Sequence, residues 1–193
     1  MLLPKRCVIC RIAGRGLCDS CAATLSPAPD LAPPPGLASC RSLFLYEGSG
    51  KDVVAALKFD NHRDAVQLIG TTLALLADAS AASFDAVTWA PTTTRRRRDR
   101  GYDQSELLAR AVASALGLPC NAHLQRAGDV SQTGRTRAER LDGPQFVAVR
   151  RSPPHVLLVD DVRTTGSTLC AAADTLTEAG ATEVHGVTLA VTL

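Results

Sequence analysis

The segment 156–168 (VLLVDDVRTTGST) constrains the fold more than any other part of the chain. Its first four residues are apolar, which is the pattern of a strand buried on both faces, as in a parallel sheet. Asp160 and Asp161 follow, at the end of the strand where ligands of open α/β sheets bind. The stretch 164–168 then turns through Gly166 into a helix, and the free N–H groups of a helix start suit a phosphate. We therefore expect an open α/β sheet with an anion site at this edge.

The two adjacent carboxylates call for a different ligand group, because they would repel a phosphate. Sugar hydroxyls or a Mg²⁺ ion are the partners that suit Asp160 and Asp161. A generic strand-to-helix turn, in which the aspartates cap the helix or line an unrelated acidic pocket, is the alternative.

Strand and helix patterns alternate along most of the chain. Strands are predicted at 43–46, 86–90, 146–149, 155–159 and 184–191, and helices at 48–59, 64–79, 104–116 and 167–179. The helix at 104–116 has the clearest limits, because Asp103 and Glu106 form a capping box and Gly117 suits its end. This alternation predicts a mostly parallel sheet flanked by helices. The polar stretch 125–145 lacks periodicity and is interpreted as a possible hood over an active site.

Four cysteines near the start of the chain form two Cys-x-x-Cys pairs. Cys7, Cys10, Cys18 and Cys21 have the spacing of a small four-thiolate zinc site, and a segment this short needs such a metal to fold. The alternatives are a redox or disulfide pair and cysteines without a shared role. We expect one structural Zn²⁺ in a module at 1–25, a Pro-rich connector at 26–40 and the α/β domain at 41–193.

Charge and hydropathy limit the class of protein. The net charge of +2 is too small to make the whole molecule attractive to nucleic acid. We find no apolar run that fits a signal peptide or a membrane span, so a cytoplasmic protein without a membrane partner is expected.

An arginine-rich run at 95–100 (RRRRDR) follows the strand predicted at 86–90. One interpretation is a solvated loop, which could attract nucleic acid. The other is an anion contact, because parallel strands bring their C-terminal loops to one edge and arginine binds phosphate groups in a bidentate way.

Taken together, these segments resemble the type I phosphoribosyltransferases and, among them, the ComF family of competence proteins. The resemblance extends over the cysteine pairs, 57–59, 96–109 with its Arg-Gly-Tyr-Asp-Gln, 132–140 and 156–168. It implies a type I phosphoribosyltransferase-like fold that binds phosphoribosyl pyrophosphate (PRPP) with Mg²⁺.

The resemblance also implies roles for individual residues. The ribose hydroxyls would contact Asp160 and Asp161, and the 5′-phosphate would be held by Thr164, Thr165, Gly166, Ser167 and Thr168. The pyrophosphate candidates are Arg96, Arg97, Arg100 and Lys58; for Lys58 the alternative is a helix-terminal cation. The hood candidates are Gln132, Arg137 and Arg140, whose alternative is a solvated loop.

Two functions are consistent with these predictions. The first is Mg²⁺-dependent transfer of the phosphoribosyl group to an unknown acceptor. Hypoxanthine-guanine enzymes carry a carboxylate at the position of Thr164, so a purine acceptor activated by that group is disfavoured here. The second is a non-catalytic PRPP- or nucleotide-binding protein that acts with single-stranded DNA or DNA-uptake proteins. The oligomeric state stays open.

Overall fold

The computed structural model describes residues 6–59, 63–78, 82–127 and 144–193. The strands are β1 (Ser39–Leu45), β2 (Ala86–Trp89), β3 (Leu124–Arg126), β4 (Phe146–Ala148), β5 (His155–Arg163) and β6 (Glu183–Val191). The helices are α1 (Asp19–Ala22), α2 (Gly48–Phe59), α3 (Arg63–Asp78), α4 (Thr94–Arg100), α5 (Gln104–Leu116) and α6 (Ser167–Glu178).

Four strands form the central sheet, in the order β1-β6-β5-β2, and every neighbouring pair is parallel. The predicted parallel sheet flanked by helices is therefore confirmed. Because the strands are parallel, the C-terminal ends of β2 and β5 lie at the same edge, which places the segments after Trp89 and Asp160 close together.

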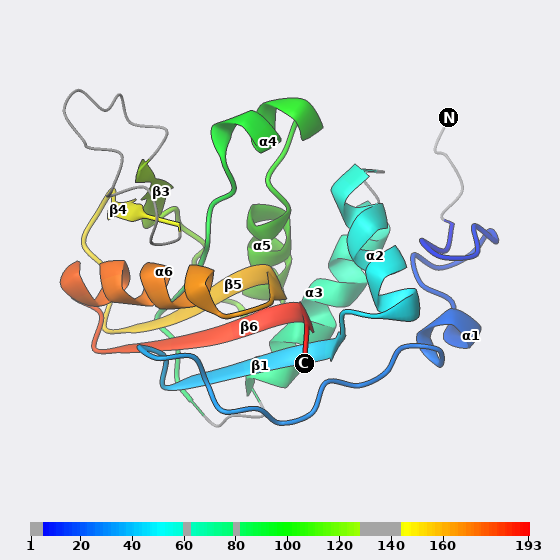
Figure 1. Ribbon diagram of the computed structural model, residues 1–193, viewed down its shortest axis with the longest axis horizontal. Coiled ribbons are helices and arrows are strands. Elements are labelled where there is room, and N and C mark those ends of the chain that lie inside the picture. Colours follow the sequence, from blue (N-terminus) through cyan, green and yellow to red (C-terminus); the bar gives the residue numbers. More distant parts are fainter. Residues whose placement is uncertain (1–5, 60–62, 79–81, 128–143) are drawn as a thin grey trace.

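Side chains of β5 alternate between the two faces of the sheet. Leu157 and Val159 pack in the core cluster that contains residues of α3 and α5, whereas Val156 and Leu158 pack with residues of α6. In Figure 1, α6 lies in front of the sheet, while α3 and α5 lie behind it. Among the helices of the described residues, none has the length and hydropathy needed to cross a membrane.

Two predicted strands are longer than expected. The strand expected at 43–46 begins at Ser39, and the one expected at 155–159 continues to Arg163, with Asp160 opposite Thr188 of β6. Hydrogen bonding to the neighbouring strand β6 extends both elements, which residue preferences alone do not reveal. The aspartates therefore belong to the strand itself.

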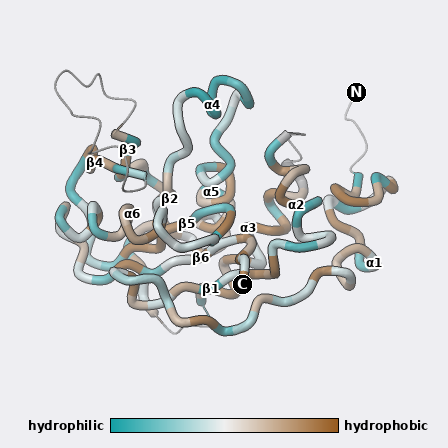
Figure 2. Tube along the Cα trace, in the orientation of Figure 1, coloured by the Kyte–Doolittle hydropathy of each residue, from teal (hydrophilic) through white to brown (hydrophobic). Residues whose placement is uncertain are grey.

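The arginine-rich run is a helix, α4, and the expectation of a loop there was wrong. Thr93 caps its start by accepting a hydrogen bond from the Arg96 backbone N–H (3.3 Å), and Gly101 ends it in a left-handed conformation (φ 78°). Arginine also has a good helix propensity. The helix has no buried residues and projects from the sheet as a polar element (Figures 1 and 2).

A small antiparallel pair flanks the region predicted as a hood at 125–145: β3 pairs with β4, which places Leu124 opposite Ala148 and Arg126 opposite Phe146. The three candidates Gln132, Arg137 and Arg140 lie in 128–143, outside the described residues.

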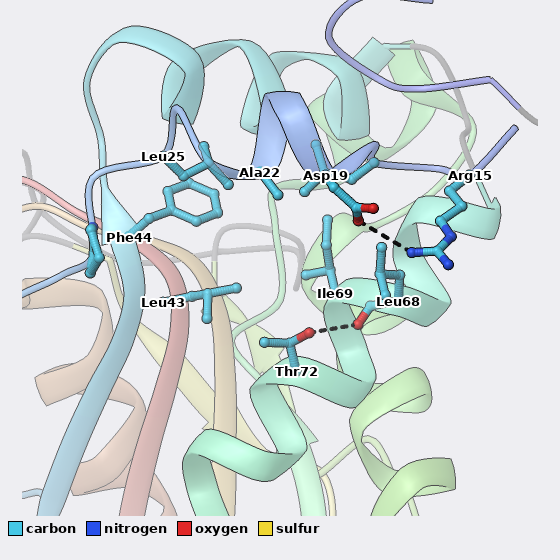
Figure 3. A pocket seen from close by; sticks show the side chains of 11 residues that line it. Arg15, Asp19, Ala22, Leu25, Leu43, Phe44, Leu68, Ile69 and Thr72 are labelled. Carbon is cyan, nitrogen blue, oxygen red and sulfur yellow. Dashed lines mark hydrogen bonds and ion pairs between the residues drawn. The ribbon is translucent and has the colours of Figure 1, made fainter. Parts of the chain in front are cut away.

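The cysteine-rich segment lies at one end of the molecule, and the chain runs back from it along β1 to the start of that strand (Figure 1). Between the segment and the sheet lies a groove of about 450 Å³, formed by Ala22 and Leu25, by Leu43 and Phe44 of β1, and by Leu68 and Ile69 of α3 (Figure 3). Its lining is mostly apolar, and its two charged residues, Arg15 and Asp19, pair with each other at 3.2 Å. Such a surface does not suit a phosphate group.

Candidate functional site

A polar cavity of about 240 Å³ lies where β2 and β5 end, enclosed also by α2, α4 and α5. Its lining contains four cationic residues, Lys58, Arg96, Arg100 and Arg126, and two carboxylates, Asp160 and Asp161. Ala90, Pro91, Thr92, Gln104, Ser105, Val162 and Thr168 complete it. The excess of cations suits an anionic ligand, and the carboxylates suit hydroxyl groups on the same ligand.

Asp160 is buried and is fixed through one carboxylate oxygen. Its Oδ1 accepts hydrogen bonds from the Ser105 hydroxyl (3.0 Å) and from the Asp161 backbone N–H (2.8 Å). Burial, reinforced by the neighbouring charge of Asp161, raises the pKa of Asp160 to about 8. The raised pKa favours the protonated form of this carboxyl group in the ligand-free chain, which lowers the negative charge that an anionic ligand meets.

Asp161 makes an ion pair with Lys58 from the last turn of α2, with 3.1 Å between Nζ and Oδ2. Both side chains are about three-quarters buried, with exposures of 22% and 24%. Lys58, which the sequence predicted as a pyrophosphate-binding residue, therefore does line the cavity. Its charge also neutralises Asp161, which was predicted to bind the ribose.

The arginines of α4 divide into two groups. Arg96 and Arg100, four residues apart on one side of the helix, line the cavity. Arg97, the third predicted pyrophosphate residue, does not line it and instead lies 3.7 Å from the Glu106 carboxylate. Arg95 pairs with Asp99 on the exposed surface.

The start of α5 holds the cavity walls together. Asp103 caps the helix by accepting hydrogen bonds from the backbone N–H groups of Ser105 and Glu106, as predicted. Its second oxygen accepts a hydrogen bond from the Thr92 N–H (2.8 Å), which ties the segment before α4 to α5. Glu106 does not complete a capping box through a described bond; it pairs with Arg110 at 2.8 Å.

The loop at 164–168 leads into α6 with Gly166 as its N-cap (φ 82°), and no side chain caps the helix there. Thr168 lines the cavity, while Thr164, Thr165 and Ser167 are exposed. A Cβ at Gly166 would lie 3.0 Å from Pro34, so the Pro-rich segment packs on this loop. Arg163 strengthens the contact by donating to the Ala32 carbonyl (2.7 Å). The start of α6 therefore has backbone N–H groups without a side-chain cap beside the cavity, and the Pro-rich segment packs against the loop that precedes it.

Several lining residues received no role from the sequence. Gln104 lies within the segment 96–109 that carries the family resemblance, but in that segment only the arginines were assigned a binding role. Ser105 contacts Asp160 across the fold, and Arg126 lies 5.6 Å above the Phe146 ring, on the β3–β4 pair. No spacing rule brings these residues to 160–168, so only the tertiary structure reveals them.

The four cysteines predicted as zinc ligands lie together, with their sulfur atoms within 4.8 Å of one another. The Cys10 and Cys18 sulfurs are 3.7 Å apart, close to the roughly 3.8 Å expected between thiolates on a tetrahedral zinc ion. The pKa of the Cys21 thiol rises to about 12, because of the neighbouring Cys18 thiol and then of burial. A bound cation would favour the thiolate form of these neighbouring sulfurs, so the cluster could hold a zinc ion.

We expect protein purified without chelator to contain one zinc per chain, measured by elemental analysis. Cys10→Ser should lose the metal, and protease should then cut within residues 6–25, since the segment has too few buried residues to fold without it. Cys120→Ser is the matched control, because Cys120 lies outside the cluster. Zinc-free wild-type protein that resists protease in this segment would refute the metal site.

Comparisons with known proteins show what this chain is similar to. Residues 103–191 match the family model of the phosphoribosyl transferase domain. Competence protein ComFC of Streptococcus pneumoniae is 28% identical over 155 residues, which cover 78% of this chain and 67% of that protein.

Two solved structures are also similar to this chain. The glutamine PRPP amidotransferase of B. subtilis has 28% identity, a TM-score of 0.45 and covers 65% of this chain, but the match spans only 26% of the amidotransferase. Purine phosphoribosyltransferase from Pyrococcus horikoshii has 17% identity and a TM-score of 0.42, with 66% of this chain and 72% of that chain covered. The fold assignment rests on the family model and the parallel sheet.

The chain thus has a type I phosphoribosyltransferase-like fold with an N-terminal cysteine cluster. Within that class it is ComF-like, as the match to the pneumococcal competence protein supports.

Proposed function

We propose that the polar cavity binds PRPP and that the protein transfers its phosphoribosyl group to an acceptor. One observation carries this proposal: cations of α2 and α4, the carboxylates of β5 and the start of α6 all line a single cavity. The 5′-phosphate would bind the loop 164–168, the ribose hydroxyls Asp160 and Asp161, and the pyrophosphate Arg96, Arg100 and Lys58.

In the proposed reaction, the bond between ribose C1 and the pyrophosphate oxygen breaks and the electron pair leaves with pyrophosphate. A nucleophilic atom of the acceptor bonds to C1 and releases its proton to solvent. Arg96, Arg100 and Lys58 would stabilise the charge on the departing pyrophosphate. The carboxylates Asp160 and Asp161 are the only ones among the described residues of the lining, and we assign them to the ribose rather than to acid–base chemistry.

Mg²⁺ fits this cavity, because it binds proteins through one or two carboxylates together with ligand phosphates. Asp161, which is partly exposed, and Asp160 would supply those carboxylates. The ion would neutralise pyrophosphate charge when bound. We also propose that the protein works in the reducing cytoplasm, where the four thiols stay available for zinc.

Calorimetric titration tests the ligand. PRPP with Mg²⁺ should bind one-to-one and more tightly than either ribose 5-phosphate or pyrophosphate, because each of these fills only part of the cavity. Release of pyrophosphate is then measured with a panel of nucleobases and amines as acceptors. Failure of PRPP to bind saturably would contradict the proposal as a whole.

The second candidate function is non-catalytic binding of PRPP or a nucleotide during DNA uptake. The exposed side of α4, with Arg95 and Arg98, favours it, because these arginines are free of the cavity and could contact a polyanion. The name of the pneumococcal relative, a competence protein, points the same way. Tight PRPP binding without pyrophosphate release on any acceptor would support this candidate over the transferase.

A further inference from the structure

Gln104, the first residue of α5, is an unexplained buried amide at the cavity. Its side chain lines the cavity and has only 4% of its surface exposed. The amide oxygen Oε1 accepts a hydrogen bond from Arg100 Nη1 at 2.9 Å. The amide nitrogen Nε2 has no hydrogen-bond partner among the described residues.

The orientation of this amide is set by its partner. A guanidinium group only donates hydrogen bonds, so the acceptor Oε1 has to face Arg100 and Nε2 has to face away from it. The adjacent polar side chains are engaged, because Asp103 accepts backbone N–H groups and the Ser105 hydroxyl donates to Asp160. A buried donor without a partner is costly and uncommon in folded proteins. An acceptor brought by a ligand would satisfy it.

The chemistry of the surroundings indicates which acceptor that is. Gln104 lies beside Arg100, and Arg96 lines the same cavity one helical turn earlier on α4. These cations favour an anionic oxygen over a neutral acceptor at this position. A hydrogen bond from an amide N–H to a charged oxygen is also stronger than one to a neutral oxygen.

We propose that Gln104 is a ligand-binding residue that recognises the pyrophosphate group of PRPP. Nε2 donates a hydrogen bond to a pyrophosphate oxygen, while Oε1 holds Arg100 in place to bind the same group. This inference rests on the proposed function, because it assigns one residue of that site to one part of its ligand.

Gln104→Glu separates the two roles of the amide. The glutamate keeps an oxygen acceptor for Arg100 but replaces the Nε2 donor with an anionic oxygen. PRPP affinity, measured by calorimetry with Mg²⁺, should fall at least about tenfold, since a hydrogen bond to a charged group is lost. Binding of ribose 5-phosphate, which lacks the pyrophosphate, should be unchanged.

Gln67→Glu is the matched control, because it makes the same charge change on the exposed surface of α3 and should bind both ligands as wild type does. Unchanged PRPP affinity in Gln104→Glu would overturn the inference and leave PRPP binding intact. Equal loss of both ligands would also overturn it, because it would indicate a general disturbance of the site. Wild-type protein that binds neither PRPP nor pyrophosphate would instead contradict the proposed function, and this inference with it.

A second measurement uses the wild-type chain, in case the buried glutamate prevents folding. The side-chain amide signals of Gln104 in a proton–nitrogen spectrum are identified by their absence in Gln104→Met. On addition of Mg²⁺ and pyrophosphate they should shift and exchange more slowly with solvent. Signals that stay unchanged at saturating pyrophosphate would overturn the inference.

Discussion

Replacing Arg96 and Arg100 together by alanine should weaken PRPP binding by at least about a hundredfold, because two hydrogen-bonding cations are lost. Both residues line the polar cavity from one side of α4, and the carboxylates of β5 line the same cavity. Calorimetry with PRPP and Mg²⁺ measures the loss. Ribose 5-phosphate should bind nearly as it does to wild type, because its phosphate would bind the loop 164–168 instead.

The same helix offers the control. Arg95→Ala with Arg98→Ala removes the same charge from α4 but from residues that do not line the cavity. Arg95 is 91% exposed and its pair with Asp99 is 4.0 Å long, so its loss should change stability little. This control should bind PRPP as wild type does. Equal weakening by the two double variants would mean that net charge, not the cavity, governs binding.

The control variant also tests the DNA-uptake alternative. If α4 contacts a polyanion through its outer side, fluorescence anisotropy with single-stranded DNA should show weaker binding for the Arg95/Arg98 variant than for wild type. Binding that is equal in both proteins would exclude these two arginines as the contact.

The architecture could be predicted from local patterns. Apolar patterns predicted the observed limits of α2 and α5 and the correct sheet class, and the Asp103 cap and Gly117 marked the two ends of α5. The position of the loop 164–168 between β5 and α6 could be predicted for the same reason, since a strand, two carboxylates and a helix start are all contiguous in the chain.

The composition of the cavity wall could not be predicted in the same way. The charge pattern of the arginine run predicted a loop, whereas in the structure the Thr93 cap and the Gly101 stop delimit a helix. Which arginines face inward depends on the helical spacing of α4, which makes Arg96 and Arg100 neighbours and turns Arg97 toward Glu106. Contacts such as Ser105 with Asp160 join residues 55 positions apart, and no local pattern records them.

Asp160→Asn should make the protein more stable and at the same time weaken its binding of PRPP. Asparagine keeps Oδ1, which is the oxygen that accepts both the Ser105 hydroxyl and the Asp161 N–H. It removes the buried carboxyl, whose pKa rises from 3.8 to about 8 because of burial and of Asp161. It also replaces Oδ2 by a donor, which cannot accept a ribose hydroxyl or bind Mg²⁺.

The stability gain depends on pH in a defined direction. Below pH 3.8 the carboxyl is protonated in both the folded and the unfolded chain, so wild type and variant should differ least there. Between this value and about pH 8 the unfolded chain releases the proton while the folded chain retains it, so wild-type stability falls as the pH rises. The variant has no carboxyl group at this position, so its stability does not fall with pH for this reason. At pH 8 its free energy of unfolding should exceed that of wild type by more than about 2 kcal/mol.

Urea unfolding from pH 4 to pH 8 measures this difference, and calorimetry measures PRPP affinity, which should fall at least about tenfold in the variant. Asp52→Asn changes an exposed carboxylate of α2 outside the cavity and should alter neither quantity. A stability difference that does not grow with pH would show that Asp160 is ionised in the folded chain. Undiminished PRPP affinity would remove Asp160 from the ribose site. We therefore expect higher stability and lower PRPP affinity in the same variant. This combination is expected of a buried carboxyl group that serves ligand binding and lowers the stability of the fold.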